Sequence, residues 1–350
     1  MLLKERYFLH MHTDIVSKIE GYLRFIKPDM RREWNSRNKM IFGDEYRPVQ
    51  KNRVNLFWTG TYKGEITEHE NLGDYLSLVV VEYMLKQRGL DLNAQIDRTE
   101  YLYAIGSIIG FGLQDATIWG SGLLRKENAF RLVRSKLDIR AVRGPYTKEY
   151  LNKMGFNCPE IYGDPAVLMP IIYSCNAEKR YSCSIVLHHS SGLREHIDEL
   201  KDMGLHYIEI KTTNYKHFVD EIAQSDMVIS SALHGIILAE AYGVPTVYLK
   251  DIEINQDFKF DDYYSGTGRV QYEYARTIDE AIKIKPVNNL PKLGNMCSAL
   301  METFPYDLWP GGGKTYVLEC LIIVQSDLLL LYSCYIFVIT YIYNINSIVQ

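Results

Sequence analysis

Short apolar runs alternate with amphipathic segments along the chain between about residue 50 and residue 250. The short runs are rich in β-branched and aromatic side chains, which is typical of buried strands. The segments between them repeat apolar positions at three- and four-residue spacing, which predicts helices. The predicted strands are 54–58, 101–105, 116–119, 139–142, 184–187, 207–210, 227–229 and 246–249; the predicted helices are 15–25, 75–87, 146–153, 193–203, 218–223 and one beginning near residue 233.

This alternation predicts an α/β protein with parallel sheets, because parallel strands need a crossover that a helix usually supplies. The stretch at residues 163–170, with its glycine and prolines, separates two such series. We therefore expect two Rossmann-like domains that face a cleft. The first covers residues 1–170, including a 1–50 extension, and the second covers residues 171–309.

Residues 310–350 form an apolar tail with no charged residue after Asp327. An uncharged run of about 20 residues is long enough to cross a bilayer. However, serine, threonine and asparagine dilute the run, and no lysine or arginine follows it. The sequence leaves three interpretations open: a membrane anchor, a buried terminal element or a non-native tail.

The composition excludes several classes of protein. With 47% apolar residues in 350, the chain can form a substantial core, and its net charge of -4 argues against a general nucleic-acid binder. The six cysteines form no C-x-x-C pair and no cluster with zinc spacing, which fits reduced thiols in the cytosol and predicts no metal site. The charged N-terminal residues do not resemble a secretory signal.

Small and polar residues follow strand after strand. Ligands bind beyond the carboxyl ends of the strands in open parallel sheets, so these residues together indicate one cleft, although each alone is typical of an ordinary turn. The residues are Asn71, Gly73, Asp74, Gly106, Ser107, Gly120, Ser121, Gly122, Arg143, His188, His189, Ser230, Ser231 and His234.

His234 lies in "SSALHGIILAEAYGVP", where the strand at 227–229 gives way to a helix. One interpretation is a core or capping histidine, with Ser230 or Ser231 as the N-cap. The other is a proton donor or acceptor, because a helix N-terminus and a bound phosphate shift a histidine pKa in opposite directions around neutrality. Glu240, two turns later, either orients His234 or faces solvent.

Basic side chains suggest how the cleft could hold an anion. Arginine forms a bidentate fork with a carboxylate or phosphate, and Arg143 at a strand end is expected to point into the cleft; the alternative is a surface ion pair. Lys250 and Lys259 follow the strand after His234. The latter lies between two phenylalanines, where it either extends to solvent or faces a phosphate. Neither a P-loop nor a dinucleotide-binding glycine motif is present.

Six segments in order resemble the polysaccharide pyruvyl transferases. They are "NLGDYLS", "IWGSG", "IRAVRGPYTKEYL", "GDPAVLMP", "SSALHGIILAEAYGVP" and "FKFDDYYSGTG", within a match over about residues 50–309 that ends with "METFPYDLW". The resemblance implies a glycosyltransferase-B-like fold of two facing Rossmann domains. It also implies transfer of the enolpyruvyl unit of phosphoenolpyruvate to two hydroxyls of a sugar. The products are a pyruvate ketal and phosphate.

The resemblance also implies roles for individual residues. His234 matches the family's proposed general acid or base, Arg143 matches an arginine expected to hold the donor, and Lys259 is the candidate for a family lysine. Some members have arginine two positions before the histidine, where this chain has Ala232; Lys250 or Lys259 would then replace it. We expect the donor to contact Ser230, Ser231, Leu233, Gly235, Lys250, Gly120 and Ser121, and the acceptor to contact Asn71, Gly73 and Asp74.

The expected partners are phosphoenolpyruvate and a saccharide or lipid-linked oligosaccharide, with no separate cofactor and no nucleic acid. The expected location is the cytoplasm, at the inner face of the membrane when the acceptor is lipid-linked or residues 328–350 contact lipid. Two alternatives stay open. One is a nucleotide-sugar-dependent glycosyltransferase of the same architecture, in which Glu240 would hold a ribose. The other is a non-catalytic binding module of a polysaccharide assembly complex.

Overall fold

The computed structural model describes residues 50–58, 71–110, 115–126, 128, 136–251, 254, 256–284 and 290–312. The chain divides into two compact units, Met1–Pro305 and Tyr306–Gln350. The described part of the second unit contains the 3-10 turn η4 (Tyr306–Leu308). The helix predicted at 15–25 and nearly all of the tail lie outside the described residues. Within the described ranges, no helix is long and apolar enough to cross a membrane.

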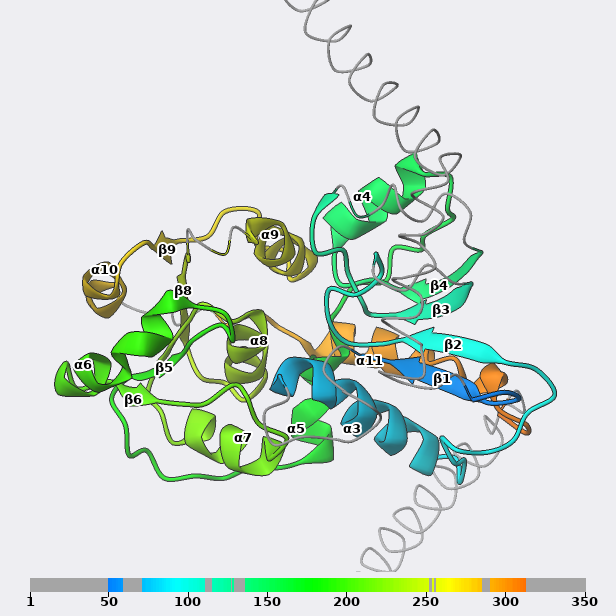
Figure 1. The fold of residues 1–350 in the computed structure, drawn as a ribbon, viewed down its shortest axis with the longest axis horizontal. Helices are drawn as coiled ribbons and strands as arrows, with labels where there is room; N and C mark the ends of the chain where they lie inside the picture. Colours follow the sequence, from blue (N-terminus) through cyan, green and yellow to red (C-terminus); the bar gives the residue numbers. More distant parts are fainter. Residues whose placement is uncertain are drawn as a thin grey trace, which may run out of the picture. The chain divides into compact units, whose positions relative to one another are not determined.

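The first sheet has four parallel strands in the order β1-β2-β3-β4 (Figure 1). Its strands are short and apolar because both faces of a parallel sheet are covered. Leu151 of α4 packs on Ile118 and Ile139 in the core beneath this sheet. The elements of this half are β1 (Val54–Phe57), α3 (Leu72–Lys86), β2 (Glu100–Tyr103), β3 (Ala116–Trp119), β4 (Leu137–Ala141) and α4 (Pro145–Lys153).

The second sheet has five parallel strands in the order β6-β5-β7-β8-β9, also seen in Figure 1. Ile185, Ile229 and Val247 from its central strands form a separate core cluster. The elements are β5 (Ser184–Val186), η3 (Gly192–His196), α6 (Ile197–Asp202), β6 (His206–Tyr207), α7 (Tyr215–Ala223), β7 (Val228–Ser230), α8 (Leu233–Ala241), β8 (Thr246–Leu249), α9 (Asp257–Gly266), β9 (Tyr274–Ala275) and α10 (Ile278–Lys283).

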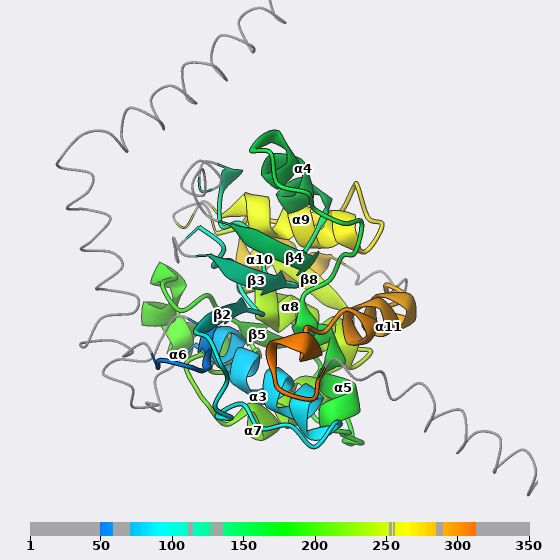
Figure 2. The same ribbon diagram turned by 90° about the vertical axis from the view of Figure 1, so that its right-hand side faces the viewer.

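The two halves are joined by more than the connecting chain. The 3-10 turn η2 (Pro165–Leu168) and α5 (Met169–Ile172) pack against both α3 and α8. α11 (Gly294–Glu302, orange in Figure 2) follows the second sheet in sequence but contacts η2 and, through Leu300, the end of β3 in the first half. The indole of Trp119 donates to the Leu300 carbonyl at 2.9 Å, and Phe304 packs edge-on against Trp119. Residue 170, the predicted domain boundary, lies inside the first compact unit. The division into two domains at this residue therefore stays a prediction.

α9 is attached to the second sheet by a buried carboxylate. Both carboxylate oxygens of Glu240 in α8 accept hydrogen bonds from the guanidinium of Arg269, at 2.6 and 2.8 Å. The Tyr263 hydroxyl of α9 donates to the same carboxylate at 2.8 Å, and Thr246 also donates to it. Glu240 thus neither orients His234 nor faces solvent, because its oxygens are taken up by this network.

The structure confirms an α/β protein with parallel sheets, and each strand predicted from the apolar runs is present. The sixth is shorter than expected, at His206–Tyr207, because the chain bends away after two residues. The pattern missed α5, β9, α10 and α11, and it gave no helix for α9. Four tyrosines and phenylalanines in α9, two of them adjacent, hide its helical spacing, since aromatic side chains cover most of its circumference.

Replacing Glu240 should destabilise the protein strongly. Glu240→Ala leaves the largely buried Arg269 without its carboxylate, and breaking a buried pair costs about 3–5 kcal/mol. The matched control is Glu149→Ala, which removes an exposed ion pair to Lys153 and should cost about 0.5 kcal/mol. Urea unfolding of both variants measures the difference. Equal losses would show that the Glu240 network does not hold the fold together.

Candidate active site

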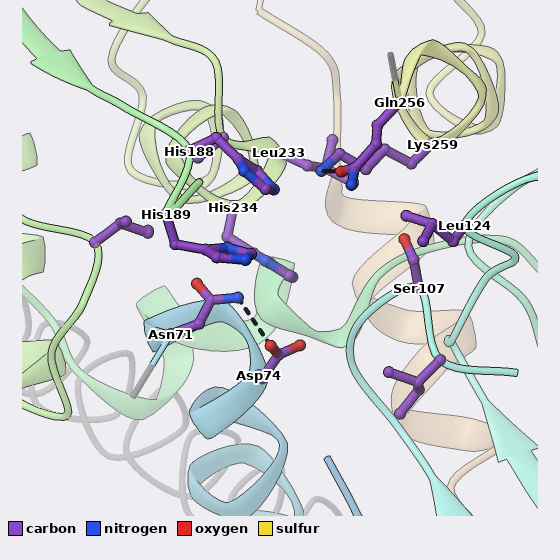
Figure 3. Close-up of a pocket in the computed structure, with 13 residues that line it drawn as sticks. Asn71, Asp74, Ser107, Leu124, His188, His189, Leu233, His234, Gln256 and Lys259 are labelled. Atoms are coloured by element: carbon purple, nitrogen blue, oxygen red, sulfur yellow. Dashed lines mark hydrogen bonds between the residues drawn. The ribbon is translucent and has the colours of Figure 1, made fainter. Parts of the chain in front are cut away.

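A cavity of about 280 Å³ lies at the carboxyl ends of strands from both sheets (Figure 3). Its walls come from the start of α3, the loops after β2, β3, β5 and β6, the start of α8, and the start of α9. This is where parallel sheets place their ligands. The lining residues are Asn71, Asp74, Ser107, Ile108, Leu124, His188, His189, Ile210, Ala232, Leu233, His234, Gln256 and Lys259.

His234 is the second residue of α8 and is nearly buried. Its ring packs directly on the backbone of Gly73 in α3, where an added Cβ would lie 1.8 Å from the ring Nδ1. Only glycine allows this approach. On the other side, the ring Nε2 lies 3.5 Å from Oδ2 of Asp164, which is fully buried. Gly73 and Asp164 therefore fix the orientation of the imidazole.

Asp164 divides its carboxylate between two tasks. Oδ1 accepts from the Ala166 amide at 3.0 Å and caps η2. Oδ2 and His234 Nε2 have no hydrogen-bond partner among the described residues, and the two atoms lie 3.5 Å apart. A buried carboxylate in this place holds the ring and stabilises the imidazolium when it forms. The sequence signal was an aspartate directly before a proline, which is typical of an N-cap.

Lys259 reaches the cavity from the first turns of α9 and is 7% exposed. Its ammonium donates to Oε1 of Gln256 at 2.5 Å, and among the described residues no carboxylate lies at ion-pair distance from it. Burial, followed by the like charge of Arg143, lowers the pKa of Lys259 to about 7, although Asp74 acts in the opposite direction. A buried cation without a counterion is costly, and such sites often bind anions.

His188 and His189 follow β5 and line the cavity beside each other, with ring centroids 4.1 Å apart. Burial, with the nearby charge of Lys259, lowers the pKa of His188 to about 2, so its ring is neutral at physiological pH. Its Nδ1 accepts from the Ser190 amide at 3.3 Å, which leaves the proton on Nε2. His188 is therefore a neutral hydrogen-bond donor. Burial also lowers the pKa of His189.

Asn71 and Asp74 form the opposite, polar end of the cavity, as Figure 3 shows. The Asn71 amide donates to the Asp74 carboxylate at 2.8 Å. The backbone of Asn71 bridges to Lys211, and the Leu72 amide donates to the Ile210 carbonyl, so the start of α3 is fixed to the second half. Both residues were expected to contact an acceptor, and both lie in the cavity.

Arg143 does not line the cavity. It is fully buried rather than on the surface, and its guanidinium pairs with Asp262 of α9 at 3.0 Å. The expectation that it points into the cleft is therefore wrong, although it donates to Ser107, which does line the cavity.

Most of the residues expected to contact a donor also lie outside the lining. Leu233 alone of that group lines the cavity. Ser230 turns the chain from β7 into α8, where its hydroxyl accepts from the Ala232 amide at 3.1 Å. The Ser231 hydroxyl accepts from the His188 amide at 2.9 Å and so positions that neighbour. Lys250 forms an ion pair with Asp257 at 2.6 Å.

Gly235, Gly120 and Ser121 have packing roles in the structure. A Cβ at Gly235 would lie 2.4 Å from the Ser230 hydroxyl, and one at Gly120 would lie 2.3 Å from Pro165. Gly120 also has φ 87°, which favours glycine. The Ser121 hydroxyl donates to the Gly106 carbonyl at 2.8 Å and is buried.

The described residues contain no group of three or more potential metal ligands arranged around one point. The thiols of Cys158, Cys175, Cys183 and Cys297 are free. Among the polar residues of the site, the strand-end pattern assigned no role to Asp164 and Gln256. Gln256 begins the helix whose spacing the sequence concealed, so no pattern could place it in the site.

Lys259→Met should stabilise the protein at neutral pH. The folded chain gives up the lysine proton near pH 7, whereas the unfolded chain keeps it to about pH 10.5. The cost of burying the ammonium is thus fully present at pH 7 and below, and it disappears as pH rises towards 10.5. At about 1.4 kcal/mol per pKa unit, we expect a gain on the order of 5 kcal/mol at pH 6.5 and roughly 1 kcal/mol at pH 9.5.

Urea unfolding at the two pH values measures this gain. Lys201→Met is the control, because that lysine is exposed and pairs only with Asp198 at 3.4 Å. If Lys259→Met were destabilising at both pH values, the buried ammonium would be a structural anchor.

A known protein family matches the part of the chain that contains most of the cavity residues. Residues 71–250, just over half of the chain, match the family model for polysaccharide pyruvyl transferase. This range includes every cavity residue except Gln256 and Lys259.

Two curated relatives match over longer stretches. An uncharacterized protein of Acanthamoeba polyphaga mimivirus is 26% identical over 250 residues, which cover 67% of this chain and 86% of that protein. The succinoglycan biosynthesis protein ExoV of Rhizobium meliloti (strain 1021) is 28% identical over 222 residues, which cover 58% of this chain and 63% of ExoV. No solved structure matches significantly. Because the family model spans more than half of the chain, we conclude that the protein belongs to the polysaccharide pyruvyl transferase family.

Proposed function

We propose that this protein transfers the enolpyruvyl unit of phosphoenolpyruvate to two hydroxyls of one sugar, forming a pyruvate ketal and releasing phosphate. Membership of the family supports pyruvyl transfer to a polysaccharide. The observation that supports this donor is Lys259: a buried cation without a carboxylate partner, in the same cavity as a histidine–aspartate pair. Phosphoenolpyruvate supplies the missing negative charges through its phosphate and its carboxylate.

The donor end of the cavity combines one charge with neutral donors. The Lys259 ammonium would hold an anionic oxygen of the donor, with its orientation set by Gln256. His188 would donate a neutral hydrogen bond from Nε2, because its ring cannot become protonated near neutral pH. Neutral donors suit a site where phosphate must leave, since they hold the anion without trapping it as strongly as further charges would.

His234 would act as the general acid and base of the reaction. It first gives a proton to the methylene carbon of the enol, which becomes a methyl group, and one sugar hydroxyl adds to the adjacent carbon and loses its proton. The C–O bond to phosphate then breaks, phosphate leaves with the electron pair, and a second hydroxyl of the sugar adds and loses its proton. Of the two protons released, one restores the acid and one leaves with phosphate or solvent. Asp164 would stabilise the charged form of His234.

The acceptor would bind at the Asn71 and Asp74 end of the cavity. A carboxylate beside an amide accepts and donates hydrogen bonds to sugar hydroxyls, which is the chemistry this end offers. The acceptor class we propose is a surface polysaccharide or its lipid-linked precursor, and the place of action is the cytoplasm. No separate cofactor enters the scheme, and phosphoenolpyruvate is the second substrate.

The architecture we propose for this reaction is glycosyltransferase-B-like, with the two parallel sheets as two Rossmann-like domains that face the cavity. A nucleotide-sugar glycosyltransferase of the same architecture is less well supported. Glu240, its expected ribose ligand, is buried and held by Arg269, Tyr263 and Thr246. A non-catalytic binding module would not need the orientation that Gly73 and Asp164 impose on His234.

Incubation of the full chain with phosphoenolpyruvate and a panel of galactosides, glucosides and N-acetylmannosaminides tests the reaction. We expect phosphate release that depends on the acceptor, and a mass gain on the sugar that corresponds to a pyruvate ketal. His234→Ala should lower the rate about 10² to 10⁴-fold because it removes the general acid. Asp164→Asn should lower it roughly 10²-fold, because the amide cannot stabilise an imidazolium.

The control is His196→Ala, since that histidine is exposed and paired only with Glu199; it should keep the parental rate. Phosphoenolpyruvate that neither raises the melting temperature nor releases phosphate with any acceptor would refute the proposed donor. If phosphoenolpyruvate raises the melting temperature but no acceptor releases phosphate, the donor is supported and the panel lacks the right acceptor.

Donor affinity should fall as pH rises above about 7. The cationic form of Lys259 binds the donor, and this form is lost as pH rises through the pKa of about 7 in the free protein. The donor phosphate titrates near pH 6, so its own charge is complete above pH 7. By linkage, Kd should rise by up to tenfold per pH unit.

Calorimetric titration with phosphoenolpyruvate between pH 6.5 and 9 measures this dependence. Lys259→Arg should flatten it, because guanidinium stays charged over this range. A pH-independent Kd in the parent protein would argue against contact between Lys259 and the donor.

A further inference from the structure

Arg143 joins three separate walls of the cavity from a position behind them. Its Nη1 donates to the hydroxyl of Ser107, which lines the cavity after β2. Its Nη2 donates at 2.7 Å to the carbonyl of Leu123, and the next residue, Leu124, lines the cavity after β3. Its Nε and Nη2 both lie 3.0 Å from Oδ2 of Asp262 in α9. A planar guanidinium with five donors suits such a junction, and an ammonium does not.

Both carboxylate oxygens of Asp262 accept hydrogen bonds, as the guanidinium of Arg143 donates them from each of its nitrogens. Both side chains are inaccessible to solvent. The second oxygen of Asp262 accepts from the Thr147 amide at 2.8 Å, and the Thr147 hydroxyl donates to Oδ2 at 2.6 Å. Thr147 belongs to the first turn of α4, so Asp262 attaches α9 to the first half of the molecule. A buried ion pair persists only when its remaining hydrogen bonds are satisfied in this way.

The same face of α9 holds Lys259 and Asp262. They are three residues apart and so lie on one side of the helix, one turn from each other. Gly266 continues this face, where a Cβ would lie 2.9 Å from the Arg143 carbonyl. Figure 1 shows α9 lying against α4, with which it is in contact. Fixing Asp262 therefore fixes the depth at which Lys259 enters the cavity.

Glycines around the pair show how closely its surroundings fit. A Cβ at Gly122 would lie 2.4 Å from Cζ of Arg143, and a Cβ at Gly144 would lie 1.9 Å from the Asp262 carbonyl oxygen. The backbone thus packs against the guanidinium at Gly122 and against Asp262 at Gly144. A ligand could reach the guanidinium only after displacing Asp262 and moving the loop at Gly122.

We propose that Arg143 and Asp262 are positioning residues: together they hold Ser107, Leu124 and Lys259 in place as one anion-binding wall of the cavity, and Arg143 does not bind the donor itself. The proposal rests on the proposed function only in that the wall binds an anion. It differs from the role that the resemblance implied for this arginine.

The electrostatics of the wall give the proposal a second consequence. Lys259 is surrounded by Arg143 behind it, Asp74 on α3, and His188 and His189 after β5. After burial, the like charge of Arg143 is the main cause that lowers the pKa of Lys259, while Asp74 raises it. Loss of the Arg143 charge should therefore raise the pKa of Lys259 and keep it cationic to higher pH.

Inorganic phosphate is the probe, and calorimetric titration of the full chain between pH 6 and 9.5 is the measurement. Three variants are compared with the parent protein: Asp262→Asn, Arg143→Lys, and the double variant Arg143→Met/Asp262→Leu. Replacing a whole buried ion pair with apolar side chains is often neutral or stabilising, so the double variant should fold. Arg140→Met/Asp138→Leu is the matched control, an exposed arginine–aspartate pair in β4 with its charges 2.7 Å apart.

We expect Asp262→Asn and Arg143→Lys to bind phosphate at least tenfold more weakly, with the control unchanged. The double variant should also bind more weakly, and the pH above which its binding declines should move upward. Unchanged or tighter binding by Asp262→Asn would overturn the proposal, because it would show a released Arg143 acting as a ligand. A double variant with the parental affinity and the parental pH dependence would overturn it too.

If the double variant fails to fold, the two single variants decide the matter in the same way. Parent protein that binds no phosphate would also refute the anion-binding wall. Because phosphate binding is the measurement, a failure of pyruvyl transfer would refute the proposed reaction and leave this result standing.

Discussion

A buried charge is costly unless an opposite charge lies beside it, and this constraint shapes the region around the cavity. Most of the buried charges there have an opposite charge nearby, and Lys259 is the exception among the described residues. These side chains are largely buried, so an unpaired charge would cost several kcal/mol. Arg143 has Asp262, Arg269 has Glu240, and His234 faces Asp164. Among the described residues, Lys259 contacts the neutral Gln256 and the ring of Phe260 and has no carboxylate at ion-pair distance. The pairs around it are complete, which is why we propose that a bound anion neutralises this cation.

The two complete pairs act on the same helix from opposite sides. Asp262 attaches α9 to the first half through Arg143 and Thr147, and Tyr263 attaches it to the second half through Glu240. Adjacent residues of a helix point in different directions, so a single turn can satisfy both attachments. α9 is thus held between the two halves, and Lys259 one turn earlier is placed with little freedom. Precise placement of this kind is what electrostatic catalysis requires, because a fixed charge need not reorganise during the reaction.

The sequence predicted the fold class and the strands because a parallel sheet covered on both faces leaves apolar runs that need no tertiary information to recognise. It also predicted that His234, Asn71 and Asp74 would meet, since strand ends gather at one edge, whereas Lys259 was a candidate through the family resemblance. It could not predict the direction in which a strand-end side chain points. Arg143 turns away from the cavity because Asp262, more than a hundred residues later, offers it a buried carboxylate. No local pattern records a pairing at that separation.

The same limit explains the residues that the sequence assigned to the wrong place or overlooked. Ser230, Gly235 and Gly120 are small because backbone or side chains approach them, and a pattern of small residues does not separate this cause from ligand binding. Asp164 was placed only in the stretch that separates the two series, because its capping bond is local, whereas His234 lies 70 residues later in the chain.

Ala232 shows how the charge of the cavity depends on its whole lining. It lines the cavity two residues before His234, where the resemblance places an arginine in some members of the family. An arginine here would add a second cation beside His188 and further disfavour any positive charge on that ring. With alanine, the proposed binding of an anion rests on Lys259 and on the neutral donors around it. A lysine that titrates near neutrality would make this binding depend on pH, whereas a guanidinium at position 232 would stay charged, so the choice of cation would set the pH range in which the proposed ligand binds.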